Sequence, residues 1–103
     1  MDKYTKDGMV AVLVSPGFGA GWSTRAGENS EFYCMDRGLV ELHMRGADRD
    51  EVQAYCALFG GEPYMGGWGD VEVEWLEPGT LFTIEEYDGA ESLRLISDLS
   101  MTA

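Results

Sequence analysis

Six consecutive apolar residues, Met9–Val14, constrain the fold most, because they run directly into a glycine-rich segment, SPGFGAGWSTR, at positions 15–25. The apolar, β-branched run predicts a central strand covered on both faces. Glycine at every second position from Gly17 gives a backbone that turns sharply and lets another group approach closely. A linker would not need Phe18 and Trp22, and a hairpin turn would be shorter. We therefore interpret 15–25 as a shaped binding loop.

A second loop, Pro63–Gly69, again combines glycine with aromatic residues. Glycine amides can converge on an anion, hydroxyl and guanidinium groups would strengthen the site, and the rings could stack on a base. The spacing matches neither the P-loop nor the dinucleotide-binding fingerprint. In the alternative interpretation, the rings cover a sheet edge and the glycines relieve crowding. The candidate ligand-binding residues are Gly17, Phe18, Gly19, Gly21, Trp22, Ser23, Thr24, Arg25, Tyr64 and Trp68.

Capping residues predict two helices in the middle of the chain. Asp36 is an N-cap for a helix that runs to about Arg45 and stops at Gly46. Asp48 opens a second helix, in which Glu51 would bond back to complete a capping box. Apolar residues then recur at helical spacing from Val52 to Phe59, which predicts a stripe that packs in the core.

Three further strands are predicted after the helices, at 71–75, 81–87 and 92–96, with a hairpin turn at Asp88-Gly89. Residues 26–30 read as a flexible connector and 31–35 as a short extended piece. The predicted fold is α+β: an N-terminal strand, two helices and a three-stranded antiparallel meander, with the helices on one face of the sheet. Residues 1–103 form one domain, with loose ends at 1–8 and 98–103.

Charge narrows the range of partners. The chain has 19 acidic and 7 basic residues, a formal net charge of −12, which disfavours direct nucleic-acid binding and anionic membranes and suits a basic protein partner. Nine acids and one base follow from Asp70 onward. Carboxylates along a strand could mimic a phosphate backbone, or they could protect a sheet edge. The partner-binding candidates in this alternative are Glu72, Glu74, Glu85 and Glu86.

Catalytic and metal-binding patterns are weak. His43 is the single histidine, no nucleophile elbow is present, and Cys34 and Cys56 with one histidine fall short of a closed zinc site. We therefore expect a protein that is not an enzyme and has no catalytic residue, metal or cofactor. The N-terminus lacks an apolar signal segment and no run reaches spanning length, which predicts a cytoplasmic protein with reduced thiols.

Segments 12–24, 39–42 and 84–92 resemble small acidic accessory proteins encoded by tailed bacteriophages and prophages, although residues 25–36 depart from that pattern. The resemblance implies a counter-defence role in the host cell. The first hypothesis is a sponge for a small phosphorylated or nucleotide signal, for which a homo-oligomer could close the site. The alternative is an acidic inhibitor or nucleic-acid mimic, similar to anti-CRISPR proteins, that blocks a basic host defence protein. A virion component is a third interpretation.

Overall fold

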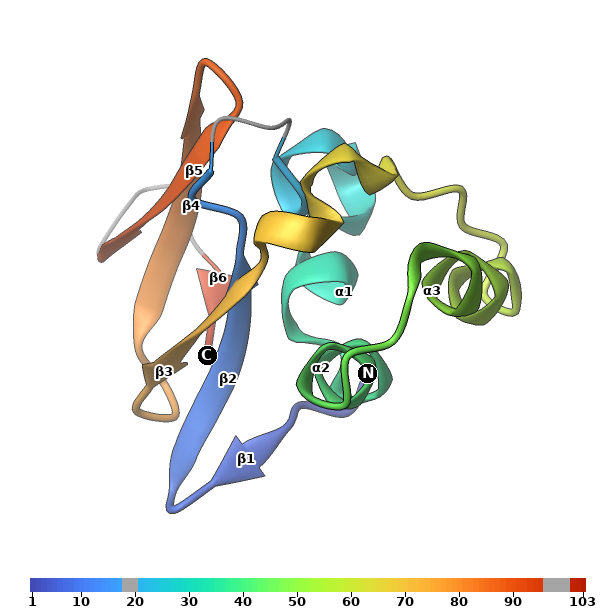
Figure 1. The fold of residues 1–103 in the computed structure, drawn as a ribbon. Coiled ribbons are helices and arrows are strands. Elements are labelled where there is room, and N and C mark those ends of the chain that lie inside the picture. The colour runs from blue at the N-terminus through green and yellow to red at the C-terminus, as the bar shows by residue number, and fades with distance from the viewer. Residues whose placement is uncertain (18–20, 96–100) are drawn as a thin grey trace.

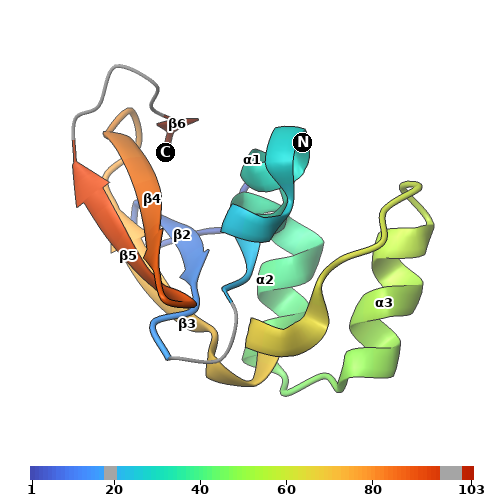
Figure 2. The same cartoon turned by 90° about the horizontal axis from the view of Figure 1, so that it is seen from above.

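A computed structural model describes residues 1–17, 21–95 and 101–103. The predicted α+β class is confirmed: two antiparallel three-stranded sheets lie to one side of a group of helices (Figures 1 and 2). The strands are β1 (Thr5–Lys6), β2 (Met9–Val14), β3 (Glu72–Leu76), β4 (Leu81–Tyr87), β5 (Ala90–Leu95) and β6 (Met101–Thr102). The helices are α1 (Ser30–Met35), α2 (Arg37–Met44) and α3 (Arg49–Ala57), with 3-10 turns η1 (Ser23–Arg25), η2 (Gly27–Asn29) and η3 (Met65–Asp70).

Strand β2 is the centre of the structure. It lies between β1 and β3, with Val10 opposite Leu76 and Val14 opposite Glu72. Ala11 and Leu13 pack toward the helices, whereas the valines on the other face pack against Phe82 of the second sheet. The prediction of a strand covered on both faces is therefore confirmed.

The predicted meander is wrong, because β3 pairs with β2 and not with β4. Strand β4 pairs instead with β5 and β6, and forms the second sheet. The two strands serve different cores: Val73 packs with the helices, while Phe82 and Ile84 pack on the opposite face of β2. Consequently the helices cover one face of the first sheet and the second sheet covers the other (Figure 2).

Both predicted helices are present with their expected N-caps. The Asp36 Oδ2 atom accepts a hydrogen bond from the Leu39 N–H at 3.2 Å, and Asp48 Oδ1 accepts one from the Glu51 N–H at 3.0 Å. The reciprocal half of the capping box is absent among the described residues. The Glu51 carboxylate instead pairs with Arg45 at 2.5 Å, which links the ends of α2 and α3.

The segment before α2 was predicted incorrectly. Residues expected to be a connector and an extended piece form η2 and α1. Helix α1 is short, but its last turn buries Tyr33 in the core under the helices and Cys34 and Met35 in the core between the sheets. The weak local preference for an extended conformation is thus overridden, because the helix buries three successive side chains.

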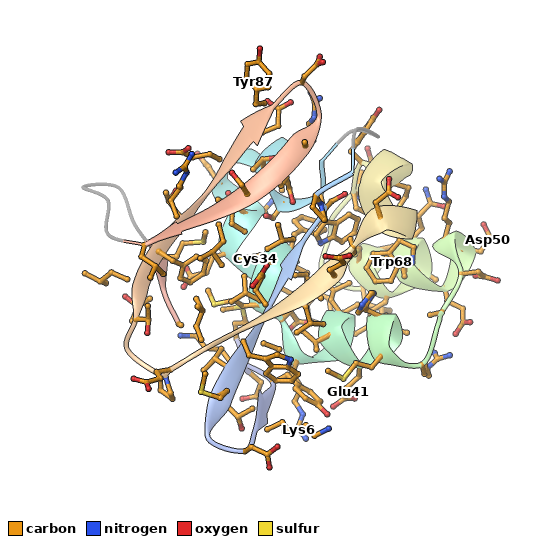
Figure 3. All side chains as sticks on the ribbon, turned by 60° about the vertical axis from the view of Figure 1, so that its left-hand side comes forward. Lys6, Cys34, Glu41, Asp50, Trp68 and Tyr87 are labelled. Carbon is orange, nitrogen blue, oxygen red and sulfur yellow. The ribbon has the colours of Figure 1, made fainter. Side chains whose placement is uncertain are left out.

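Both ends of the chain, expected to be loose, are joined to the body where they are described. Strand β1 pairs with β2, and the backbone of Lys3 forms an isolated antiparallel β-bridge with that of Asp36. The buried Ala103 donates its N–H to the Thr80 carbonyl at 2.9 Å. Residues 98–100 lie outside the described residues. The predicted turn at Asp88-Gly89 is confirmed, with positive φ at both positions, and the adjacent Tyr87 projects from the hairpin tip (Figure 3).

Candidate functional site

Three backbone N–H groups of the first glycine loop, those of Ser15, Trp22 and Thr24, donate to a carboxylate of the chain itself. Glu91 of β5 is 2% exposed, and its Oε1 accepts the Ser15 N–H at 2.9 Å. Its Oε2 accepts the Trp22 N–H at 2.7 Å, the Thr24 N–H at 3.0 Å and the Thr24 hydroxyl at 2.6 Å. The Glu91 N–H donates in return to the Ser15 carbonyl at 2.9 Å. An internal anion therefore sits where the sequence predicted a phosphate.

The two predicted loops do meet, but through buried rings. Trp22 is 2% and Trp68 7% exposed, and their ring centroids lie 5.1 Å apart. Trp22 Nε1 donates to the Tyr33 carbonyl at 2.6 Å and Trp68 Nε1 to the Ala47 carbonyl at 3.1 Å. Trp68 lies in the interior between strands and helices (Figure 3). Neither ring offers a free face for stacking on a base.

The glycines leave room for the opposite loop. A methyl group on Gly67 would overlap the Gly21 carbonyl and approach Ser15 Oγ, which donates a 3.0 Å hydrogen bond to the Gly67 carbonyl. A methyl group on Gly17 would overlap the Asp70 side chain in the same way. This geometry agrees with the alternative interpretation, in which glycines relieve crowding.

Of the remaining ligand-binding candidates, Arg25 and Tyr64 lie together at the surface, whereas Ser23 is buried apart from them. Ser23 is fully buried, and its hydroxyl has no hydrogen-bond partner within the described part of the chain. Arg25 lies 3.4 Å from the Glu86 carboxylate and 5.6 Å from the centre of the exposed Tyr64 ring. A small cavity of 160 Å³ reaches Trp22, Arg25 and Tyr64. Phe18 and Gly19 lie outside the described residues, and nucleotide binding stays a prediction.

The four candidate glutamates do not form one row. Glu72 and Glu74 lie exposed on one face of β3. Glu85 pairs with Arg94 at 3.1 Å. The neighbouring Glu86 points to the opposite face of β4, where its Oε1 accepts the Gly89 N–H at 2.9 Å and faces Arg25. The predicted acidic surface is therefore divided between two sheets.

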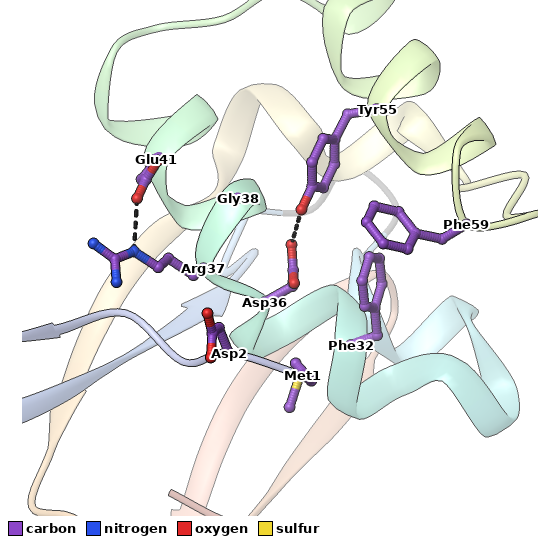
Figure 4. Close-up of a pocket in the computed structure, with 9 residues that line it drawn as sticks. All are labelled: Met1, Asp2, Phe32, Asp36, Arg37, Gly38, Glu41, Tyr55 and Phe59. Atoms are coloured by element: carbon purple, nitrogen blue, oxygen red, sulfur yellow. Dashed lines mark hydrogen bonds and ion pairs between the residues drawn. The ribbon is translucent and has the colours of Figure 1, made fainter.

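A separate hollow on the helical side combines aromatic rings with carboxylates. This aromatic groove has a volume of 640 Å³ and is open to solvent between α1, the start of α2 and the end of α3 (Figure 4). Its lining residues are Met1, Asp2, Phe32, Asp36, Arg37, Gly38, Glu41, Tyr55 and Phe59.

Three rings form one side of the aromatic groove. The centroid of Phe59 lies 5.2 Å from that of Phe32 and 5.2 Å from that of Tyr55, both in tilted arrangements. Phe59 is 61% exposed, so its apolar surface remains accessible. Gly38 allows this packing, because a methyl group there would overlap the Tyr55 ring and hydroxyl. Accessible rings of this kind can interact with a cation through their faces.

Asp36 lies deep in the aromatic groove, at 7% exposure, and is held there by two donors. Its Oδ2 accepts the Tyr55 hydroxyl at 2.5 Å in addition to the α2 cap from Leu39. Burial raises the pKa of the Tyr55 hydroxyl and the bond to Asp36 raises it further, so the phenol remains a donor at neutral pH. Asp36 Oδ1 accepts no hydrogen bond from the described residues.

The charges that line the aromatic groove favour a positively charged guest. Asp2, Asp36 and Glu41 supply three carboxylates, against the guanidinium of Arg37 and the N-terminal ammonium of Met1. The Arg37 Nε atom lies 2.8 Å from Glu41 and compensates that carboxylate, so the lining residues together keep one negative charge in excess (Figure 4). Rings beside uncompensated carboxylates bind ammonium or guanidinium groups.

Sequence reasoning missed this groove although two of its signals were visible. Tyr55 and Phe59 are four residues apart and were assigned to a core stripe, yet Phe59 projects at the end of that stripe. Gly38 lowers the helix propensity of α2, but a larger residue at this position would overlap the Tyr55 ring. Neither signal identifies a surface groove without knowledge of how α1 meets α3.

Comparison of the chain with protein-family models, curated proteins and solved structures finds no match. Among the described residues, no helix has the length and apolar character needed to span a membrane. No group of three His, Cys, Asp or Glu side chains within the same residues is arranged to hold a metal ion.

Proposed function

We propose that this protein is a non-enzymatic binding module that takes a basic segment of a partner protein into the aromatic groove. The observation that carries the proposal is the deep carboxylate of Asp36 beside the half-buried ring of Tyr55 and the exposed ring of Phe59. A cation on such rings gains about 0.5–1 kcal/mol when exposed and about 2 kcal/mol when desolvated. The net charge of −12 would also speed encounter with a basic partner.

This proposal keeps the alternative hypothesis of an acidic protein inhibitor. It places the contact with the partner in the aromatic groove and not on the glutamates of the strands. A nucleotide would compete with Glu91 for the Trp22 and Thr24 amides, and it would approach against the net negative charge. A basic segment would be attracted by the same charge. In a phage-type context, which the resemblance implies, the partner would be a host defence protein in the cytoplasm.

Binding of a fluorescein-labelled lysine octapeptide, followed by anisotropy, tests the proposal. Replacing Phe59 with leucine removes a ring but keeps an apolar side chain, and we expect affinity to fall about fivefold. Leu58→Ala is the matched control, because Leu58 is 80% exposed, adjacent in sequence and outside the groove. Its affinity for the peptide should equal that of the wild type.

Three results would contradict the proposal. The first is equal affinity in the Phe59→Leu and Leu58→Ala variants. The second is loss of binding only when Glu72 and Glu74 are both changed to lysine, which would assign the partner to the strand face. The third is dimerisation of the protein without peptide, abolished by Phe59→Leu in sedimentation, which would make a second copy of the chain the occupant.

A further inference from the structure

The geometry points to a primary ammonium group, the head of a lysine side chain, as the cation that the aromatic groove accepts, in preference to a guanidinium or a quaternary ammonium. This inference rests on the proposed function and specifies its ligand chemistry. It follows from which oxygen atoms of Asp36 and Tyr55 already take part in hydrogen bonds and which can still accept one.

The first step concerns the carboxylate. Asp36 Oδ2 already accepts two hydrogen bonds, from the Leu39 N–H at 3.2 Å and the Tyr55 hydroxyl at 2.5 Å. When the hydrogen bonds made by the described residues are counted, Oδ1 is the carboxylate oxygen left to accept one from a guest. A guanidinium binds a carboxylate best through both oxygens at once, in a fork of two parallel bonds. That arrangement is blocked here, whereas a compact ammonium needs a single oxygen.

The second step concerns the phenol. The Tyr55 hydroxyl gives its hydrogen to Asp36, so its oxygen keeps lone pairs that can accept a bond from a guest. Asp36 Oδ1 and Tyr55 Oη are therefore two neighbouring acceptors, because the hydroxyl bonds to Oδ2 of the same carboxylate (Figure 4). An ammonium carries three N–H donors and can satisfy both, with a third left for water.

The third step concerns burial. Asp36 is 7% exposed, so a guest that covers it without donating a hydrogen bond leaves a desolvated carboxylate oxygen unpaired. A trimethylated ammonium keeps its charge and its attraction to the rings but has no N–H to donate. The flexible stem of lysine can pass the half-buried ring of Phe32 and the exposed ring of Phe59 on the way to Asp36. Trimethylation or acetylation of that lysine would weaken binding.

Amide chemical shifts of the protein, titrated with four small probes, test this inference. The probes are Nα-acetyl-lysine methylamide, its Nε-trimethyl and Nε-acetyl derivatives, and Nα-acetyl-arginine methylamide. We expect the lysine probe to bind tightest. The trimethyl probe should bind about tenfold more weakly, the worth of one hydrogen bond to a charged group. The acetyl probe, which has lost its charge, should be weaker still.

Asp36→Asn gives a matched test on the protein side. Asparagine retains helix capping and can accept the Tyr55 hydroxyl, but it places an amide donor where Oδ1 stood. Affinity for the lysine probe should fall about tenfold and the preference over the trimethyl probe should vanish. The comparison of the four probes is made on the wild-type protein. It therefore still tests the inference if the Asp36→Asn variant does not fold.

The outcomes separate this inference from the proposed function. Binding of the trimethyl or arginine probe as tight as that of the lysine probe overturns the primary-ammonium assignment while cation binding in the groove stands. Absence of binding by all three cationic probes overturns both. Lysine preference that persists in Asp36→Asn shows that other atoms select the ammonium and contradicts the assignment to Asp36.

Discussion

Replacing Glu91 with alanine is expected to lower the free energy of unfolding by about 4 kcal/mol, because several buried donors lose their acceptor together. The Ser15, Trp22 and Thr24 amides and the Thr24 hydroxyl all donate to this carboxylate at 2.6–3.0 Å. Urea unfolding followed by tryptophan fluorescence measures the change, since Trp22 and Trp68 are both buried. A variant that does not fold also agrees with the expectation.

Two further variants make the test of Glu91 specific. Glu91→Gln keeps the shape and one acceptor oxygen, so it should lose about half as much stability as Glu91→Ala. Glu85→Ala removes an exposed glutamate of the neighbouring strand, paired with Arg94 at the surface, and should change stability by at most about 0.5 kcal/mol. Equal stability of Glu91→Ala and Glu85→Ala would refute the internal role of Glu91.

Gly67→Ala is expected to cost about 3 kcal/mol, because a side chain there forces apart two backbones that now touch. Its methyl group would overlap the Gly21 carbonyl and press on Ser15 Oγ, and a backbone carbonyl cannot rotate out of the way. The hydrogen bond from Ser15 to the Gly67 carbonyl would be lengthened at the same time. Thermal unfolding by circular dichroism measures the loss.

Gly69→Ala is the matched control in the same 3-10 turn. Nothing lies within 4 Å of a methyl group at Gly69, and its φ is not positive. This variant should match the wild type or gain up to about 1 kcal/mol from the smaller entropy of its unfolded chain. If Gly67→Ala proved as stable as Gly69→Ala, the close contact between the two loops would be wrong.

The sequence predicts correctly those features that depend on interactions between residues close together in the chain, such as helix N-caps and a hairpin turn. Asp36 and Asp48 mark the starts of α2 and α3 through their own side-chain bonds to the backbone. Asp88-Gly89 fixes the β4–β5 hairpin through two residues with positive φ. The continuous apolar run of β2 reports burial on both faces without saying what covers each face.

Features that depend on distant partners could not be predicted in this way. Glu91 was one of nine acids in the C-terminal part of the chain, and nothing in its neighbours distinguishes it from Glu85 or Glu86. Its role arises only because β5 begins beside Ser15, 76 positions away in the sequence. The pairing of β3 with β2 likewise depends on which core each strand serves.

The glycine loops show how the same residues support two opposite expectations. Absent side chains beside large rings leave space, and sequence alone does not say what fills it. Here Gly67 admits the Gly21 backbone, and the rings of Trp22 and Trp68 fill the rest. Ligand binding is better supported at the exposed rings of Phe59 and Tyr64 than at the buried rings of Trp22 and Trp68.

Mapping the amide chemical shifts that a lysine octapeptide changes in the ¹⁵N-labelled protein tests the functional account most directly. The account predicts that the largest shifts fall on Phe32, Arg37, Tyr55 and Phe59, which line the aromatic groove, with small shifts in the loop at 15–25. Largest shifts in that loop, or along β3 at Glu72 and Glu74, would contradict it, as would a spectrum that the peptide leaves unchanged.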